Sequence, residues 1–170
     1  LQVLGEALAR AGRPLSQARS IVHGTTLVTN ALIERSGART ALLATRGHRD
    51  MIEIGREQRF DLYDLNLQRP EPLAPRWLRF DVPERILADG SVRDPLDSGF
   101  VERLAAELAE NGVSAVAVCF LNSYLNPIHE KLAADSIKRA APGLRVTLSS
   151  DVAPEIREYE RATTALANAY

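Results

Sequence analysis

The chain has 170 residues, of which 45% are apolar and 25% are charged, as is usual for a globular domain. Its net charge of −1 excludes nucleic-acid binding by bulk positive charge, and its single cysteine, Cys119, excludes an internal disulfide or a cysteine-based zinc cluster. The longest apolar run, Ala115 to Leu121, is far shorter than the about 18 residues that a membrane span needs. We therefore expect a cytoplasmic domain that binds neither nucleic acid nor membrane.

The first third of the chain is predicted to alternate between helices and strands. A helix over 3–10 and a short strand over 21–24 come first, and a helix over 25–35 follows. A buried strand over 39–45 and a short helix over 48–55 complete this part.

The segment 58–95 has a different texture. It contains five prolines, at positions 70, 72, 75, 83 and 95. This spacing excludes a regular helix, whereas alternation of apolar residues predicts a strand over 78–82. Asp89 and Gly90 predict a type I′ turn in a β-hairpin over 85–93, because glycine and aspartate accept the positive φ of that turn.

Regular alternation returns after Pro95. Asp97 is expected to cap a helix over 98–110, and a continuous apolar strand follows over 113–121. Asn126 and Pro127 are expected to open the next helix, as its N-cap and first residue.

The last part of the chain is predicted to hold one more strand and one more helix. The helix opened by Asn126 is expected to end before Pro142, and a strand over 145–149 follows. The terminal helix over 155–170 is expected to be capped by Ser150 or Asp151. Its buried stripe is predicted to contain Ile156, Tyr159, Thr163, Leu166 and Tyr170.

This alternation predicts the α/β class. We expect a body formed by 1–57 and 96–170, with 58–95 as a Pro-rich segment that carries the hairpin. The chain starts inside a predicted helix and ends without a helix stop signal, so we expect it to be a piece of a longer protein.

The first candidate site lies where the strand over 21–24 passes into a helix. Free backbone N–H groups and the helix dipole favour an anion or a polar substrate oxygen at such a point. The candidate residues are His23, Gly24, Thr25, Thr26 and Asn30. The alternative is a helix cap followed by a polar packing face.

Two further candidate sites carry charge. Arg46 and Asp50 follow the strand over 39–45, and an arginine suits the recognition of carboxylate or amide oxygens. The alternative there is a solvated helix start. Glu158 and Arg161 are spaced to pair on the terminal helix, and the alternative to a site is a solvated salt bridge.

Other chemistry has little support. The three histidines lack metal-ligand spacing, so we expect no metal site built from protein side chains alone. Cys119 is expected to be a buried, inert thiol, and His129 is expected to lie in the first turn of its helix. No single residue identifies itself as the catalytic base.

Several segments resemble the amino-terminal region of the hydantoinase A/5-oxoprolinase family. In the first half they are His23-Gly24-Thr25-Thr26, Thr29 to Leu32, Gly37 to Leu42, Thr45-Arg46-Gly47, Arg49-Asp50, Glu53 to Arg56, Leu62 to Leu65 and Arg69 to Leu73. In the second half they are Pro83 to Ile86, Ala115 to Cys119, Asn126-Pro127 with His129-Glu130, and Pro154 to Arg161. They occur in the family's order over about Ile21 to Tyr170.

The resemblance implies a lobe of a ribonuclease-H-like, actin-like ATPase fold, with a mixed sheet flanked by helices. It implies ATP- and Mg²⁺-dependent hydrolysis of a cyclic amide such as 5-oxoproline or a hydantoin, through phosphorylation of the carbonyl oxygen. It also implies a second ATPase lobe and a B-type subunit or fused half as partners. Thr25, Thr26 and Asn30 would then face the cleft, and Arg46 would meet the substrate or a charge.

The chain departs from the family in lacking its glycine-rich phosphate loop, which would precede Leu1, and the nucleotide motifs of the second lobe, which would follow Tyr170. We therefore expect these 170 residues to be inactive alone. Two alternatives stay open: a relative of the acetone carboxylase β subunit, and a non-catalytic lobe that scaffolds a subunit interface through 58–95.

Overall fold

The computed structural model describes residues 8, 10, 12, 26–57, 63–66 and 70–170. The chain divides into two compact units, Leu1–Glu34 and Arg35–Tyr170. In the first unit the structure describes helix α2 (Leu27–Glu34), which confirms the helix expected over 25–35 to within two residues at its start. The strand expected over 21–24 lies outside the described residues.

The second unit is built on a four-stranded sheet. Its strands are β1 (Thr40–Thr45), β2 (Arg79–Val82), β5 (Ala115–Cys119) and β6 (Arg145–Leu148), in the order β2-β1-β5-β6. All three ladders of this sheet are parallel, so the mixed sheet expected from the resemblance is not found in the part of the chain that the structure describes. Parallel pairing follows because each successive strand is reached by a crossover long enough to contain a helix.

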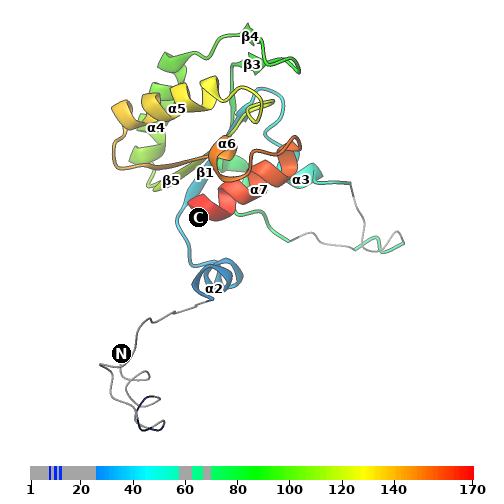
Figure 1. Cartoon of the computed structure of the whole chain (residues 1–170), viewed down its shortest axis with the longest axis vertical. Coiled ribbons are helices and arrows are strands. Elements are labelled where there is room, and N and C mark those ends of the chain that lie inside the picture. Colours follow the sequence, from blue (N-terminus) through cyan, green and yellow to red (C-terminus); the bar gives the residue numbers. More distant parts are fainter. Residues whose placement is uncertain (1–7, 9, 11, 13–25, 58–62, 67–69) are drawn as a thin grey trace. The chain divides into compact units, whose positions relative to one another are not determined.

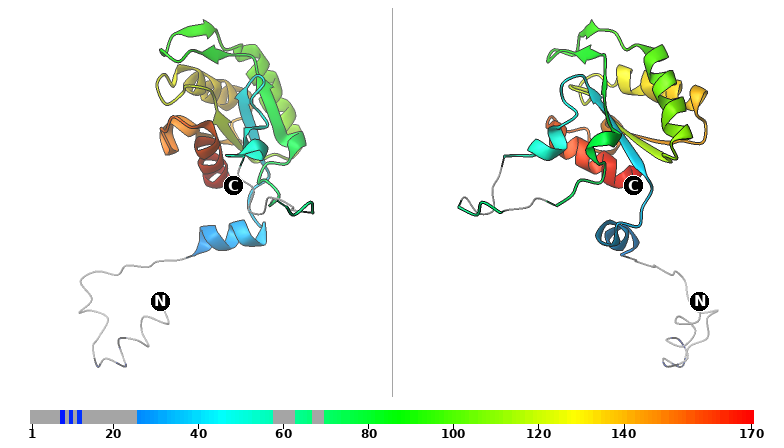
Figure 2. Two further views of the ribbon diagram at one scale, coloured as in Figure 1. Left: turned by 90° about the vertical axis from the view of Figure 1, so that its right-hand side faces the viewer. Right: turned by 180° about the vertical axis from the view of Figure 1, so that it is seen from behind.

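Helices cover both faces of this sheet (Figures 1 and 2). Helices α4 (Ser98–Glu110) and α5 (Ile128–Ala140) pack together on one face. Helices α3 (Met51–Ile54) and α7 (Glu158–Ala169) contact each other and contribute to the other face. The observed architecture is therefore α/β with a parallel sheet between helical layers.

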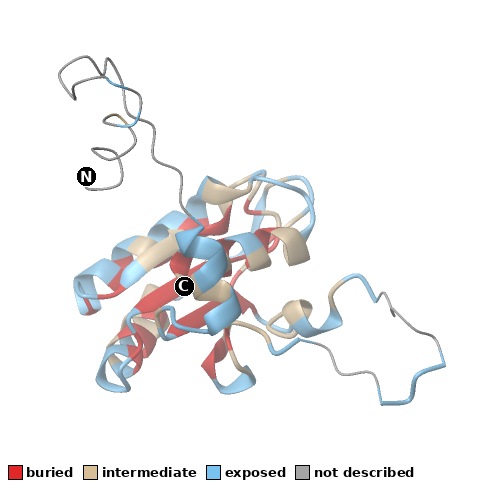
Figure 3. Ribbon diagram, turned by 90° about the horizontal axis from the view of Figure 1, so that it is seen from below, coloured by how far each residue is buried: buried red, intermediate tan, exposed pale blue. Residues whose placement is uncertain are grey.

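The central strands supply side chains to both layers, and for this reason their sequences are continuously apolar. In β5, Val116 and Val118 point into the core beneath α4 and α5, while Ala117 and Cys119 face α7. Every residue of β1 and β5 is buried, which is visible as the red strands in Figure 3. The expectation of a strand buried on both faces is confirmed for β5.

The two layers differ in side-chain size. The face beneath α4 and α5 contains leucines, valines and Phe120, whereas α7 presents Ala162, Ala165 and Ala169 to the alanines of β5. Small side chains on both partners allow the backbone of α7 to approach the sheet closely. The position of α7 is therefore set by its alanine face.

The segment 58–95 belongs partly to the sheet. After a single 3-10 turn, η2 (Arg76–Leu78), strand β2 pairs with β1, so this stretch forms an edge of the body. Leu78, Phe80 and Val82 all face the core beneath α4, as their alternation predicts.

Strands β3 (Arg85–Ile86) and β4 (Val92–Asp94) form a separate antiparallel pair. The expected type I′ turn is wrong, because Gly90 has φ 82° and Asp89 does not have a positive φ. The N–H of Gly90 donates to the carbonyl of Leu87 at 2.9 Å, and the N–H of Leu87 donates to Ser91 at 2.9 Å. The turn therefore needs the left-handed conformation at glycine alone, and Asp89 instead accepts hydrogen bonds from Ser91.

Helix ends follow local capping chemistry. Asp97 accepts a hydrogen bond from the N–H of Phe100 at 3.0 Å and caps α4 as expected. Asn126 accepts from the N–H of Ile128 at 3.2 Å, although α5 begins one residue later than predicted.

The start of the terminal helix was predicted incorrectly. Ser149 to Val152 form a separate turn of helix, α6, and α7 begins only at Glu158. Pro154 explains the break, because the residue before a proline is driven to extended backbone, and Ala153 has ψ 77°. None of the helices in the described ranges is long and apolar enough to cross a membrane.

Replacing Leu43 tests the core. Leu43 is 1% exposed in the centre of β1, so Leu43→Ala is expected to lower the free energy of unfolding by about 2–5 kcal/mol through lost burial and a cavity. The matched control Leu132→Ala, at a residue 42% exposed on α5, is expected to change it by only about 0.5 kcal/mol. Denaturant unfolding measures both, and equal losses would contradict this packing.

Candidate functional site

The carboxyl ends of the four parallel strands meet at one edge of the sheet. Strand β2 lies on one side of β1, and the later strand β5 lies on the other side of β1. The direction in which strands are added to the sheet therefore reverses between β1 and β5. In open parallel sheets, ligands bind outside the carboxyl ends of the strands at such a reversal. This edge is therefore the first place to look for a site.

A buried carboxylate, Glu84, joins the end of β1 to helix α5. The hydroxyl of Thr45, the last residue of β1, donates to Glu84 Oε1. The same hydroxyl accepts from the N–H of Leu121 at 2.9 Å, just beyond β5. The other carboxylate oxygen, Oε2, lies 2.6 Å from His129 Nδ1 in the first turn of α5. Thr45 and Glu84 together thus connect β1, the residue that follows β5, and α5.

A second buried carboxylate, Glu130, ties β5 to β6. Its Oε1 accepts from the N–H of Phe120 at 3.0 Å and from the hydroxyl of Ser149 at 2.6 Å. Its Oε2 accepts from the N–H of Ser150 at 2.9 Å. Glu130 is fully buried, and its hydrogen bonds replace the water that an ionised carboxylate would otherwise require.

Arg161 on α7 completes this arrangement, which we call the carboxyl-edge network. Its Nη2 donates to the carbonyl of Phe120 at 2.8 Å, and its Nη1 donates to the hydroxyl of Ser123. Ser123 lies 3.3 Å from Ser149, hydroxyl to hydroxyl, so two hydroxyls connect Arg161 to Glu130. The network consists of Thr45, Glu84, Phe120, Leu121, Ser123, His129, Glu130, Ser149, Ser150 and Arg161.

The solvated Glu158–Arg161 pair expected as an alternative is wrong. Arg161 is 0% exposed, because helical spacing places it on the same face as Ala162 and Ala165. The predicted stripe on this helix is also partly wrong, since Ile156 lies before α7 and is 66% exposed. The guanidinium carbon of Arg161 also lies 5.7 Å from the centre of the Tyr124 ring.

Arg46 directly follows Thr45, the network residue at the end of β1. Its own N–H donates to the carbonyl of Val82 at 2.9 Å, and the N–H of Gly47 donates to Asp81 Oδ1 at 2.9 Å. Gly47 has φ 86°, a conformation that favours glycine. Arg46 is exposed, and among the described residues no hydrogen bond or ion pair holds its guanidinium. The main chain at Arg46 is therefore held by hydrogen bonds, while its guanidinium is free to bind a ligand.

Asp50 is engaged in ion pairs. Its Oδ1 lies 2.6 Å from Arg76 Nη1 and 3.7 Å from Nη1 of the buried Arg79. Glu53 lies 3.2 Å from the same Arg79. These contacts attach α3 to the start of β2, so Asp50 has a structural part here.

Glu158 begins α7 beside Cys119. The carbonyl of Glu158 accepts from Cys119 Sγ at 3.8 Å, and burial raises the pKa of that thiol to about 12. The expectation of a buried cysteine is confirmed, and its thiolate is disfavoured at neutral pH. Glu158 also lines a cavity of about 340 Å³, together with Gly55, Arg56, Arg157, Tyr159 and Glu160.

The remaining candidates belong to the first unit or lie outside the described residues. Thr26 and Asn30 belong to the first unit, where the N–H of Asn30 donates to the carbonyl of Thr26 at 2.8 Å. His23, Gly24 and Thr25 lie outside the described residues. Their assignment to a cleft stays a prediction.

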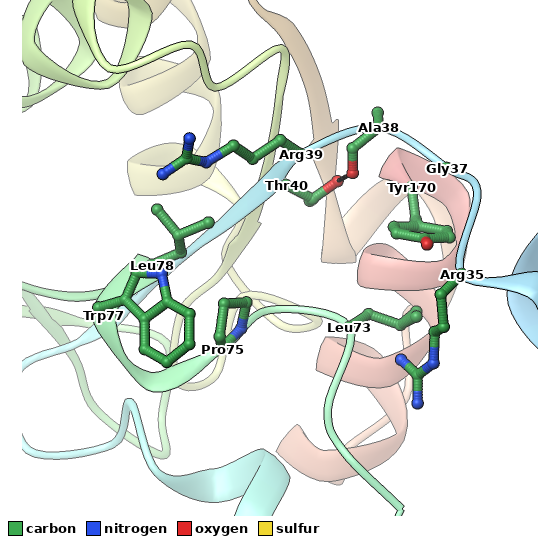
Figure 4. Close-up of a pocket in the computed structure, with 10 residues that line it drawn as sticks. All are labelled: Arg35, Gly37, Ala38, Arg39, Thr40, Leu73, Pro75, Trp77, Leu78 and Tyr170. Carbon is green, nitrogen blue, oxygen red and sulfur yellow. Dashed lines mark hydrogen bonds between the residues drawn. The ribbon is translucent and has the colours of Figure 1, made fainter.

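A larger cavity of about 390 Å³ lies at the other end of β1 (Figure 4). Trp77 and Leu78 stand at one end of it, and Leu73, Arg35 and Tyr170 at the other. Thr40, the first residue of β1, also lines it, so this cavity is separated from the carboxyl edge by the length of the strand.

The sequence of the chain has relatives over most of its length. The profile of the hydantoinase/oxoprolinase N-terminal region matches residues 1–141. The chain belongs to the hydantoinase/oxoprolinase family.

Within this family the likeness extends to named proteins. The chain is 39% identical over 151 residues to caprolactamase subunit alpha of Pseudomonas jessenii, covering 88% of this chain and 22% of that one. It is 31% identical over 199 aligned residues to 5-oxoprolinase of Saccharomyces cerevisiae, covering 100% of this chain and 15% of that one.

Solved structures agree. The crystal structure of the ATP-dependent caprolactamase from Pseudomonas jessenii superimposes with a TM-score of 0.88 and 35% identity, over 99% of this chain and 25% of that one. A nucleotide-free acetone carboxylase gives a TM-score of 0.80 and 26% identity, over 96% and 25%. The chain thus spans a quarter or less of the length of these relatives.

Segments that carry the family resemblance meet in the carboxyl-edge network. Thr45, Glu84, Glu130 and Arg161 come from four of them, far apart in sequence. Sequence reasoning proposed only Arg161 of these four as a site residue. Thr45, Glu84 and Glu130 were missed as site residues. The pattern that could have identified them is a polar side chain at the end of a buried strand, or one that packs against that end.

Neither of the two buried carboxylates of the network is available to a metal ion. Glu84 and Glu130 are buried and already accept hydrogen bonds at both oxygens, and Asp81 in β2 pairs with Arg49 and accepts from the N–H of Gly47. No group of three or more potential metal-ligating side chains occurs within the described residues. No glycine-rich phosphate loop is present in the sequence either.

Arg161 tests whether the network stabilises the fold. Arg161→Met keeps the length of the side chain but leaves the carbonyl of Phe120 without its donor, so we expect the free energy of unfolding to fall by about 1–3 kcal/mol. Arg157→Met, at an exposed residue four positions earlier, is the control and should change it by about 0.5 kcal/mol or less. An Arg161→Met protein as stable as the wild type would show that the network contributes nothing measurable.

Proposed function

We propose that the chain is the amino-terminal part of an ATP-dependent hydrolase that opens a cyclic amide. The observation that carries this proposal is the likeness, over nearly the whole chain, to the ATP-dependent caprolactamase from Pseudomonas jessenii. Caprolactam is a cyclic amide, and the relative named 5-oxoprolinase points to the same bond type. A small lactam or hydantoin ring is the substrate class.

The chemistry assigns a task to Arg46. Hydrolysis adds one water to the ring amide and yields a carboxylate and an amine on the opened chain. In the proposed reaction the carbonyl oxygen first takes the γ-phosphoryl group of ATP, and water then attacks the ring carbon while phosphate leaves and the ring nitrogen gains a proton. Negative charge gathers at this oxygen during the transfer, and a preorganised cation beside it lowers the barrier. Arg46 offers an unpaired guanidinium on a fixed main chain at the carboxyl edge, so it is the residue assigned to this oxygen.

The remainder of the assembly is proposed from the family. The parallel sheet is one lobe of a ribonuclease-H-like ATPase fold, with β3 and β4 as a hairpin insertion. His23, Gly24, Thr25, Thr26 and Asn30 face the cleft that a second lobe closes, and that lobe supplies the sites for ATP and Mg²⁺. A B-type subunit or fused half completes the enzyme, which acts in the cytoplasm.

An assay of the complete protein tests the activity. The full-length protein with its partner subunit is expected to open 5-oxoproline, a hydantoin or ε-caprolactam only when ATP is hydrolysed. Product amino acid and released phosphate would be measured together. Bicarbonate-dependent carboxylation of a ketone, with no ring opening, would contradict the proposal and favour the carboxylase branch represented by the acetone carboxylase structure.

Substitution of Arg46 tests its role in that assay. Arg46→Ala is expected to lower kcat by about 10²–10³-fold, the usual effect of removing one donor to a developing oxyanion. Arg46→Lys keeps the charge and should lose less. Arg103→Ala, an exposed arginine on α4, is the control and should leave kcat unchanged. An Arg46→Ala enzyme as fast as the wild type would remove Arg46 from the mechanism.

A further inference from the structure

We propose that Glu84 is a positioning residue that fixes the direction of Arg46 by holding the hydroxyl of Thr45. This inference rests on the proposed function in assigning Arg46 to the substrate. Its structural part, the restraint on the end of β1, stands on the contacts of Glu84 alone.

The burial of Glu84 calls for an explanation. Its side chain is 0% exposed, and within the described part of the chain its partners are the Thr45 hydroxyl and His129 rather than a lysine or an arginine. A buried carboxylate is costly unless its oxygens receive hydrogen bonds, and here both do. Full burial also means that Glu84 cannot touch a substrate, so any effect on chemistry passes through a neighbour.

Donor and acceptor roles fix the orientation of Thr45. Its hydroxyl accepts from the N–H of Leu121, so its single proton is directed to Glu84. A carboxylate only accepts, which makes His129 Nδ1 the donor to the other oxygen. Each of these groups therefore has one consistent role, and the end of β1 is locked between β5 and α5.

The short segment from Val82 to Glu84 also holds the main chain of Arg46. Val82 accepts from the N–H of Arg46, and only Pro83 separates Val82 from Glu84. The Glu84 side chain binds the Thr45 hydroxyl, and the Val82 carbonyl binds the N–H of Arg46. Because proline restricts φ, Pro83 limits how far these two contacts can move relative to each other. Rotation of the peptide between Thr45 and Arg46 would break the hydrogen bond to Val82, and a shift of the Thr45 Cα would break the contact with Glu84.

Four variants separate positioning from charge. In Glu84→Gln the amide oxygen can still accept from Thr45, and the amide nitrogen can donate to the other tautomer of His129, so activity should be largely kept. Glu84→Ala removes the contact and should lower kcat/KM by about 10²-fold, the effect of a small misplacement of a reacting group. Thr45→Ser should be active, and Thr45→Val should match Glu84→Ala.

The double variant Thr45→Val/Glu84→Ala identifies the route. If Glu84 acts through Thr45, the double variant should lose no more activity than either single variant. Losses are taken per folded molecule, with folded fraction measured by circular dichroism. If the activity loss of the double variant equals the product of the two single losses, the proposal is overturned. It is also overturned if the losses disappear once activity is corrected for the folded fraction. Glu107→Ala, at an exposed glutamate of α4, is the control.

Amide hydrogen exchange gives a readout independent of activity. The N–H groups of Arg46, Gly47 and His48 donate to Val82, Asp81 and Thr45, and these three should exchange faster in Glu84→Ala than in the wild type or Glu107→Ala. Unchanged exchange would overturn the proposal. A wild-type enzyme that opens no cyclic amide would refute the proposed function and leave this exchange result to decide the restraint.

Discussion

The buried charges Glu84, Glu130 and Arg161 must find hydrogen-bond partners inside the protein, and the ends of the parallel strands provide them. Parallel strands leave peptide groups unpaired where they end. Glu130 accepts from the N–H of Phe120, just beyond β5, and from the N–H of Ser150 in the first turn of α6, and Arg161 donates to the carbonyl of Phe120. Glu130 and two nitrogens of Arg161 thus pair with groups at the carboxyl edge, while Arg161 Nε is buried without a partner among the described residues. Leaving the paired groups without partners would carry a desolvation cost.

The network also bears on the proposed position of the substrate. The bond between Thr45 and Leu121 closes the reversal point between β1 and β5, which is open in many sheets of this type. A ligand at the carboxyl edge is therefore met by the loop in front of the network, where Arg46 and Gly47 are exposed. In the proposed function the buried network supplies rigidity, and Arg46 in this loop contacts the substrate.

Local sequence patterns predicted most elements of the body. The apolar run at β5 and the Asp97 cap of α4 were sufficient, because each depends on neighbouring residues and on burial that periodicity reveals. Membership of the hydantoinase/oxoprolinase family was also predicted from ordered motifs and is confirmed.

Properties that depend on distant contacts were not predictable. Arg161 resembles a surface arginine until β5 and the loop after it are placed against α7, and Glu84 and His129 gain meaning only as partners. The turn at Gly90 differs from the expected type because Asp89 and Ser91 satisfy each other locally. Periodicity identifies which elements exist, and the network depends on which elements become neighbours.

The most direct measurement is a crystal structure of the full-length protein with a non-hydrolysable cyclic amide bound. The account predicts the ring carbonyl within hydrogen-bond distance of the Arg46 guanidinium, in front of an unchanged Thr45–Glu84 contact. A ring bound at the opposite end of β1, in the cavity beside Trp77, with Arg46 facing solvent, would contradict it.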